Sequence, residues 1–267
     1  MKRRTSGEVL PSVVASPLGA AALRQFTEAR LALGRAGESL PTSAHLKFVG
    51  DHARARDAVW TAVDFGALTA RVEALGVSTL RVRSRAGSRA EYLRRPDLGR
   101  VLDEDSVTRL TSFAVGVRSR VAVVVADGLS AEAVSANAVP VLGALLPLLA
   151  GAGLGASAVV LAEQGRVAIG DSIGEALGAS IVVLLVGERP GLSAADSLGC
   201  YITWEPRVGT PDSRRNCVSN IRGGGLSAAD AAERVAWVVT QATGRGMTGV
   251  ALKVEETSVS PISREGS

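Results

Sequence analysis

Aromatic side chains and cysteines are both scarce in this sequence. Only 3% of the 267 residues are Phe, Trp or Tyr, so few side chains could stack on unpaired bases, and we expect no nucleic-acid binding. The two cysteines, Cys200 and Cys217, belong to no CxxC pair and to no Cys/His cluster. This pattern excludes a disulfide-stapled scaffold and argues against a metal site built by this chain.

Several familiar catalytic motifs are missing as well. There is no GxxxxGK[ST] loop, which excludes a P-loop NTPase. The GxGxx(G/A) match at residues 151–156 follows a predicted helix and precedes a predicted strand, the reverse of the order in a nicotinamide dehydrogenase. The two histidines, His45 and His52, both lie in a predicted N-terminal helix and favour a subunit contact over catalysis. We therefore expect no catalytic residues in this chain.

The charges that are present divide the chain into two parts. Residues 1–120 carry a net charge of +8 and residues 121–267 a net charge of −4, which together give +4. The basic half suits an acidic protein partner. Residues 133–162 carry no charge, but Pro140, Pro147 and the glycines at 151, 153 and 155 interrupt this run. We interpret it as a core helix followed by a strand, and expect no membrane span. The basic N-terminus has no apolar run of the kind found in a secretory signal.

Apolar β-branched runs alternate with helical periodicity along most of the chain. This order predicts an α/β fold with a Rossmann-like doubly wound parallel sheet and an N-terminal helical extension. Strands are expected within 77–84 and at 121–126, 157–161, 180–187 and 200–205; helices at 19–36, 45–60, 101–115, 131–151, 171–178 and 227–243. We divide the chain into a flexible N-terminus (1–18), a mainly helical N-terminal region (19–116), a Rossmann-like domain (117–245) and a tail (246–267).

Four loops should meet at the edge of such a sheet where ligands bind. They are DGLS (127–130), AEQGRV (162–167), GERPG (187–191) and RRNCVSN (214–220). Glu188 either contacts a ligand or marks where an uncharged strand meets water. Asp127 is either a cap or a ligand contact, and Cys217 either a ligand contact or a small buried side chain. The residues alone therefore indicate a ligand-binding domain without naming the ligand.

Longer segments, in order along the chain, resemble one protein family. They are GRAG (34–37), DHARARDAV (51–59), YLRRPDLGR (92–100), VVADGLSAEAV (124–134), GRVAIGDSIGEALGA (165–179), VVLLVGERPGLSAADSLGCY (182–201) and NCVSNIRGGG (216–225). From about residue 24 to about residue 233 the chain resembles the small (light) subunit of ethanolamine ammonia-lyase. The combination of GERPGL with NCVSNI is the most specific part of this resemblance.

The resemblance implies a carbon–nitrogen lyase that converts ethanolamine to acetaldehyde and ammonia with adenosylcobalamin as cofactor. It implies activity only in a hetero-oligomer, in which a large TIM-barrel subunit binds substrate and holds the catalytic residues. The region 19–116 would contact that subunit. The expected location is the cytoplasm, in many bacteria inside a microcompartment.

The resemblance also implies the cofactor contacts, which fall at Val167, Glu188 and Cys217. These residues lie on three of the four loops chosen above on other grounds. The alternative reading is a stand-alone cobalamin- or nucleotide-binding Rossmann module without a lyase partner.

Overall fold

The computed structural model describes residue 23 and residues 29–116 and 120–252. The chain divides into two units, Met1–Arg54 and Ala55–Ser267, which are described separately. In the first unit, residues 29–36 are not helical, so the helix expected over 19–36 is wrong for the part that can be described. The φ angles of Gly34 and Gly37 are +83° and +65°, which turns the chain and prevents a continuous helix here.

Helix α2 (Thr42–Trp60) follows this irregular segment and confirms the helix expected at 45–60. Within the first unit, the carboxylate of Asp51 accepts hydrogen bonds from Arg30, Lys47 and Arg54 at 2.7, 3.1 and 3.2 Å. The pair with Arg30 joins the segment before α2 to the helix, whereas the pairs with Lys47 and Arg54 lie within the helix.

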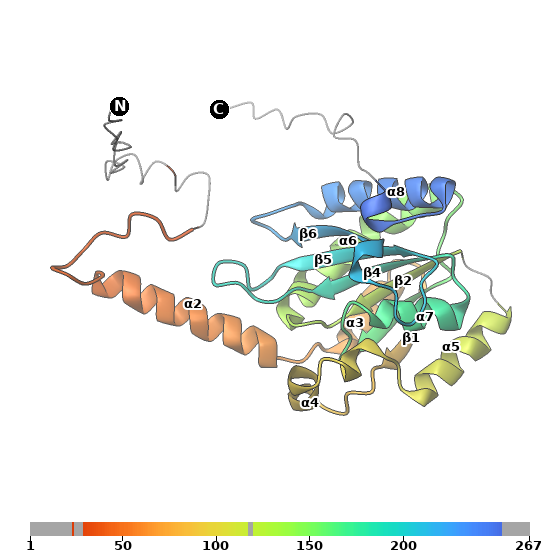
Figure 1. Cartoon of the computed structure of the whole chain (residues 1–267), viewed down its shortest axis with the longest axis horizontal. Helices are drawn as coiled ribbons and strands as arrows, with labels where there is room; N and C mark the ends of the chain where they lie inside the picture. The colour runs from red at the N-terminus through yellow and green to blue at the C-terminus, as the bar shows by residue number, and fades with distance from the viewer. Residues whose placement is uncertain (1–22, 24–28, 117–119, 253–267) are drawn as a thin grey trace, which may run out of the picture. The chain divides into compact units, whose positions relative to one another are not determined.

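A mixed six-stranded sheet forms the centre of the second unit, in the order β1-β3-β2-β4-β5-β6 (Figure 1). The strands β1, β3, β2 and β4 run parallel, whereas β5 is antiparallel to both β4 and β6. The bounds are β1 Ser78–Arg83, β2 Val121–Ala126, β3 Ala158–Glu163, β4 Ile181–Gly187, β5 Leu198–Trp204 and β6 Arg215–Ile221. The α/β class is confirmed, but the expected all-parallel sheet is corrected to a mixed one.

The length of the connections explains this difference. Residues 188–197 join β4 to β5 without a helix, and residues 205–214 join β5 to β6 through a single 3-10 turn, η3 (Asp212–Arg214). A parallel crossover needs a dozen or more residues, usually including a helix, so both connections return the chain antiparallel.

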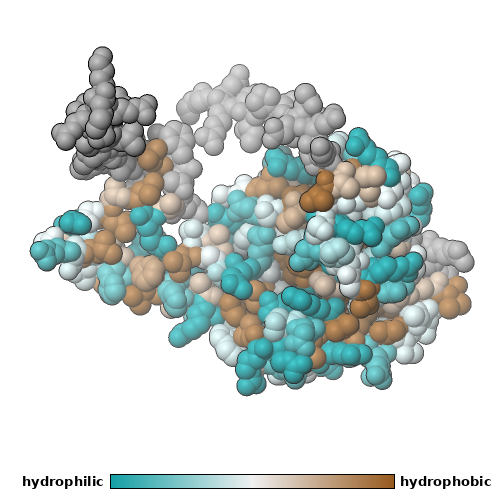
Figure 2. Space-filling model, viewed as in Figure 1, coloured by the Kyte–Doolittle hydropathy of each residue, from teal (hydrophilic) through white to brown (hydrophobic). Residues whose placement is uncertain are grey.

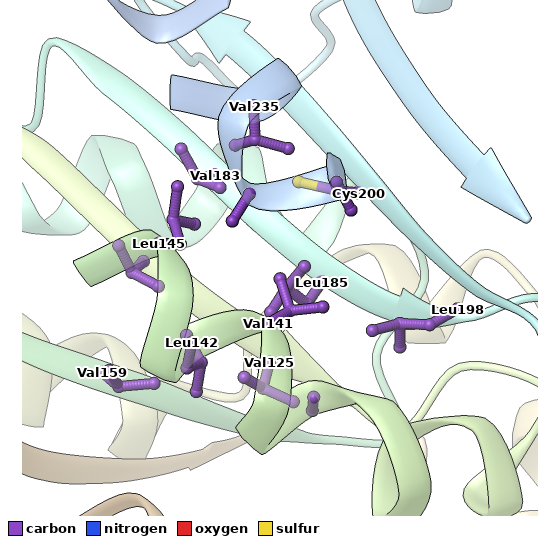
Figure 3. Close-up of a cluster of buried hydrophobic side chains, with 14 of the residues drawn as sticks. Val125, Val141, Leu142, Leu145, Val159, Val183, Leu185, Leu198, Cys200 and Val235 are labelled. Atoms are coloured by element: carbon purple, nitrogen blue, oxygen red, sulfur yellow. The ribbon is translucent and has the colours of Figure 1, made fainter. Parts of the chain in front are cut away.

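Helices cover both faces of the sheet. On one face, α3, α6 and α8 enclose the larger apolar core, into which Leu145, Leu185 and Cys200 point (Figure 3). On the other face, α5 and α7 enclose a smaller core that includes Leu110, Ile173 and Leu184. The bounds are α3 Phe65–Glu73, α5 Glu104–Gly116, α6 Ala131–Gly151, α7 Ile169–Leu177 and α8 Ala228–Arg245. Cys200, in β5, is fully buried in the larger core.

Helix α6 is long and apolar enough to cross a membrane by length and composition. In the structure Val141, Leu142 and Leu145 are fully buried in the larger core, and α6 packs against α8. It is therefore a core helix, as predicted from the sequence, and Pro140 and Pro147 lie within it.

The N-terminal part of the second unit contributes to the sheet. Strand β1 comes from the region 19–116 and pairs with β3, so the division expected at residue 117 does not separate the strands of the sheet. Residues 89–94, for which no helix was predicted, form helix α4 (Arg89–Arg94) with Ser88 as its N-cap. The 3-10 turn η2 (Leu98–Arg100) follows, and η4 (Gly249–Ala251) lies near the C-terminal end of the described chain.

Candidate functional site

The three residues expected to contact a cofactor come from three separate segments. Val167 lies between β3 and α7, and Glu188 directly follows β4, as expected. Cys217 lies inside β6, so its placement in a loop was wrong. The strand was not predicted because the sequence RRNCVSN is polar. It lies at the edge of the sheet and, among the described strands, pairs with β5 alone.

Strand register places Cys217 on the same face of the sheet as α7. Tyr201 pairs with Leu184 on one side and with Cys217 on the other. Leu184 belongs to the smaller core beneath α7, and Tyr201 packs against that core. Directly paired residues point to the same face, so Cys217 lies on this face too.

The side chain of Glu188 packs against β5 at Gly199, where the lack of a side chain leaves room for it. A Cβ atom at Gly199 would lie 2.8 Å from Oε1 of Glu188 and 3.1 Å from its Cγ, so the side chain of Glu188 occupies this space. The hydroxyl of Ser197 and the backbone N–H of Asn220 both donate to Oε2. Among the described residues, none donates to Oε1, which leaves that oxygen able to accept from a ligand.

An open cleft of about 680 Å³ lies on this face. This volume is within the range of small-molecule sites. Val167 and Cys217 line the cleft, whereas Glu188 lies beside it and is not part of its lining. The cleft lining includes Arg100, Arg166, Val167, Asp171, Tyr201, Asp212, Arg215 and Cys217.

A buried ion pair forms one side of the cleft. The guanidinium of Arg215 donates to both oxygens of Asp171 at 2.6 and 2.7 Å, and the two side chains are 4% and 2% exposed. The same guanidinium donates to the Thr210 carbonyl, the Thr203 hydroxyl and the exposed carboxylate of Asp212. Arg215 thus fixes the start of α7 and the loop before β6 relative to each other.

The surroundings of Cys217 favour the neutral form of its thiol. Burial raises its pKa; a hydrogen bond with Tyr201 acts in the opposite direction, and the negative charge of Glu188 raises it further. A thiol with a raised pKa stays protonated near neutral pH. In this form it can pack against a ligand and donate a weak hydrogen bond, but it is a poor nucleophile. The effect of Glu188 on this pKa also indicates that the two side chains lie near each other.

Sequence reasoning missed Tyr201, Asp171 and Arg215. The alternation of CYITW could have found Tyr201, since it must face away from the buried Cys200. No sequence signal pairs Asp171 with Arg215, because they are 44 residues apart and their contact depends on the unrecognised strand β6.

Asp127, left open as cap or ligand contact, supports the neighbouring loop. Its Oδ1 accepts the backbone N–H of Gly165 at 2.9 Å, and Arg89 lies 3.4 Å from its Oδ2. Arg89 also donates to the Gly128 carbonyl at 2.8 Å. Burial raises the pKa of Asp127 to about 6, although Arg89 and the backbone donors oppose this.

The raised pKa predicts a pH-dependent contribution of Asp127 to stability. The folded protein binds the proton more tightly than the unfolded chain, whose ordinary pKa is 3.8. Stability contributed by this group is therefore full below about pH 4 and is lost as the pH rises to about 6, by about 3 kcal/mol. We expect the free energy of unfolding of wild type minus that of Asp127→Asn to fall over this range. A difference that rises with pH would show instead that Arg89 holds the folded pKa low.

No cluster of three or more His, Cys, Asp or Glu side chains able to hold a metal ion occurs among the described residues. His45 and His52 belong to the first unit, on the exposed surface of α2. The cleft is thus lined by paired charges, a neutral thiol and an aromatic ring, which suits binding and orientation of a ligand.

Comparison with known proteins shows the family of this chain. Residues 19–253 match the family described as Ethanolamine ammonia-lyase light chain (EutC). The chain belongs to this family. It is 52% identical over 240 residues to the protein named Ethanolamine ammonia-lyase small subunit of Bradyrhizobium diazoefficiens, covering 90% of this chain and 92% of the relative. A protein of the same name from Rhodopseudomonas palustris is 50% identical over 231 residues, covering 86% and 88%.

The match to the light-chain family confirms the resemblance drawn from the motifs. Both units of the light chain fall within it, since the matched residues begin in the first unit and continue past α8. The segments GERPGL and NCVSNI carry the most specific part of the resemblance. They lie side by side in the structure, where the backbone N–H of Asn220 donates a hydrogen bond to Glu188.

Proposed function

We propose that this chain is the small subunit of ethanolamine ammonia-lyase and that its cleft face binds adenosylcobalamin against the large subunit. The observation that supports the proposal most is that Val167, Glu188 and Cys217, distant in sequence, lie on or beside one open face. The enzyme so formed converts ethanolamine to acetaldehyde and ammonia. Its location in the cytoplasm and its enclosure in a microcompartment stay predictions.

The residues of this face fit a corrin. A corrin is a broad, nearly flat ring whose rim carries amide groups, and the open cleft has a volume of about 680 Å³, within the range of small-molecule sites. The oxygen Oε1 of Glu188 can accept from an amide N–H, while Val167 and Cys217 supply apolar surface for the ring. A carboxylate hydrogen bond of this kind fixes the rotation of the ring on the apolar surface.

We assign the reaction itself to a large TIM-barrel subunit. When bound, the cofactor supplies a radical for hydrogen abstraction. On this chain, Asp171 and Asp212 are engaged by Arg215 and the Cys217 thiol is protonated. The contribution of the chain is therefore to bind and orient the cofactor and to keep water from one side of it.

Co-expression with the large subunit tests the proposal. We expect the two chains to co-purify and to release acetaldehyde from ethanolamine only when adenosylcobalamin is added. We expect each isolated chain to be inactive. The proposed function would be contradicted by a complex that forms but produces no aldehyde. It would also be contradicted if the large subunit bound adenosylcobalamin with the same affinity whether or not this chain was present.

Replacement of Glu188 tests its role in the cofactor site. Glu188→Ala should weaken adenosylcobalamin binding to the complex by about 1–3 kcal/mol, because a ligand hydrogen bond is lost. Glu188→Gln, which keeps a carbonyl acceptor, should lose less. The matched control is Glu233→Ala on the exposed surface of α8, outside the cleft lining, which should bind like wild type. Equal affinities of the Glu188→Ala complex and the control complex for adenosylcobalamin would show that Glu188 does not contribute to the cofactor site.

A further inference from the structure

The motif YLRRPDLGR (92–100) folds against the cleft and contributes Arg100 to its lining. Tyr92 is fully buried and its hydroxyl donates to the Gly165 carbonyl at 3.1 Å. At the other end of the motif, Arg100 lines the cleft together with Arg166. The motif therefore carries one arginine to the cleft and packs beneath another.

Arg166 is held in place by this motif. Its guanidinium lies 4.3 Å from the centroid of the Tyr92 ring, and Nη2 is 3.3 Å from the Tyr92 carbonyl. Its backbone N–H donates to the Gly99 carbonyl at 2.7 Å. A Cβ atom at Gly99 would lie 2.9 Å from both Arg166 and Tyr92, so only glycine allows this contact. The side chain is thus ordered before any ligand binds, which reduces the entropy lost on binding.

The charges around the cleft are unbalanced. Both acidic side chains that line it, Asp171 and Asp212, are bonded to Arg215. Neither Arg100 nor Arg166 forms an ion pair with any residue that the structure describes. Two guanidinium groups without carboxylate partners therefore line one wall of an open cleft, where they attract an anion.

We propose that Arg100 and Arg166 form a subsite for a phosphate group. Guanidinium groups match the geometry of phosphate oxygens, and Arg166 is next to Val167 in sequence and in the cleft lining. This inference rests on the proposed function, since the cofactor itself carries one phosphodiester, in the loop that joins its nucleotide base to the corrin. The subsite would fix that loop while Glu188 and Cys217 contact the ring.

Two corrinoids that differ in the phosphate test the subsite. The reconstituted complex of the full chain with the large subunit is titrated with adenosylcobinamide phosphate and with adenosylcobinamide, which lacks the phosphate. We expect wild type to prefer the first. Arg100→Gln and Arg166→Gln should each weaken binding of the phosphate-bearing ligand about tenfold and leave binding of the other unchanged. Arg94→Gln, an exposed arginine of α4 that does not line the cleft, is the matched control and should match wild type.

The outcomes separate this inference from the proposed function. Equal losses for both ligands would show that the arginines only support the fold and would overturn the subsite alone. Because Arg100 is exposed, Arg100→Gln gives this answer even where Arg166→Gln unfolds the loop. A wild-type complex that binds neither corrinoid would overturn both the subsite and the proposed function.

Inorganic phosphate distinguishes the two sources of the anion. If the subsite serves the cofactor, millimolar phosphate should compete only weakly with adenosylcobinamide phosphate, at ionic strength held constant with chloride. Tight binding of inorganic phosphate, with no preference between the two corrinoids, would show a site for a free anion and overturn the assignment to the cofactor.

Discussion

Asp171→Ala is expected to lower the free energy of unfolding by about 3–5 kcal/mol. The substitution leaves the Arg215 guanidinium, 4% exposed, without its two-bond partner, and only the exposed carboxylate of Asp212 remains to balance its charge. An uncompensated buried charge is among the most destabilising changes that a single substitution can make. Urea denaturation monitored by circular dichroism measures this loss directly.

Asp212→Ala provides the matched control, since Asp212 also accepts a bond from Arg215, at 3.2 Å, but is 96% exposed. We expect this variant to lose less than about 1 kcal/mol, because water replaces an exposed carboxylate. The double variant Asp171→Ala with Arg215→Met should regain most of the stability, since no buried charge is then left. Similar losses for Asp171→Ala and Asp212→Ala would show that the pair is not buried as described.

Gly187→Ala should cost about 3 kcal/mol or more. A Cβ atom there would lie 2.2 Å from the carbonyl oxygen of Ser130 and 2.6 Å from that of Asp127. Both are backbone atoms, so relief requires the loop after β2 and the end of β4 to separate. Because Gly187 immediately precedes Glu188, the movement should also weaken cofactor binding by the complex.

The control for this prediction is Gly143→Ala in the middle of α6. A Cβ atom at Gly143 meets only a side-chain carbon of Leu75 at 3.7 Å, an ordinary contact distance. Alanine is the better helix former, so this variant should be neutral or more stable by up to about 1 kcal/mol. Thermal unfolding of both variants tests the pair. A Gly187→Ala protein as stable as wild type would mean that the two loops are further apart than described.

The central part of the fold could be predicted from sequence because burial there is nearly complete. All six residues of β2 are buried, so VAVVVA reads as a strand covered on both faces. The ends of the sheet were harder to predict. Strand β6 has exposed residues and a polar sequence, and its burial depends on pairing with β5 and not on its composition.

The direction of a strand could not be predicted from the pattern of apolar residues either. The composition of β5 is the same whether it runs parallel or antiparallel to β4; the ten-residue connection without a helical period was the signal that decides it. Its misreading led to a parallel sheet where the structure has a mixed one.

The candidate site was partly visible in the sequence. The loops after β3 and β4 pointed to Val167 and Glu188, because the ends of parallel strands meet at one edge. Gly199, Arg215 and Tyr92, which position the site, act through contacts between residues far apart in the chain. Only the folded backbone brings them together, so neither spacing nor composition could assign their roles.

The most direct test of the account is a structure of this chain assembled with the large subunit and cobalamin. We predict that a carboxylate oxygen of Glu188 lies about 3 Å from an amide nitrogen of the corrin rim. We also predict that Cys217 and Val167 contact the ring. A corrin located away from the face formed by β5 and β6, with Glu188 still bonded only to Ser197 and Asn220, would contradict it.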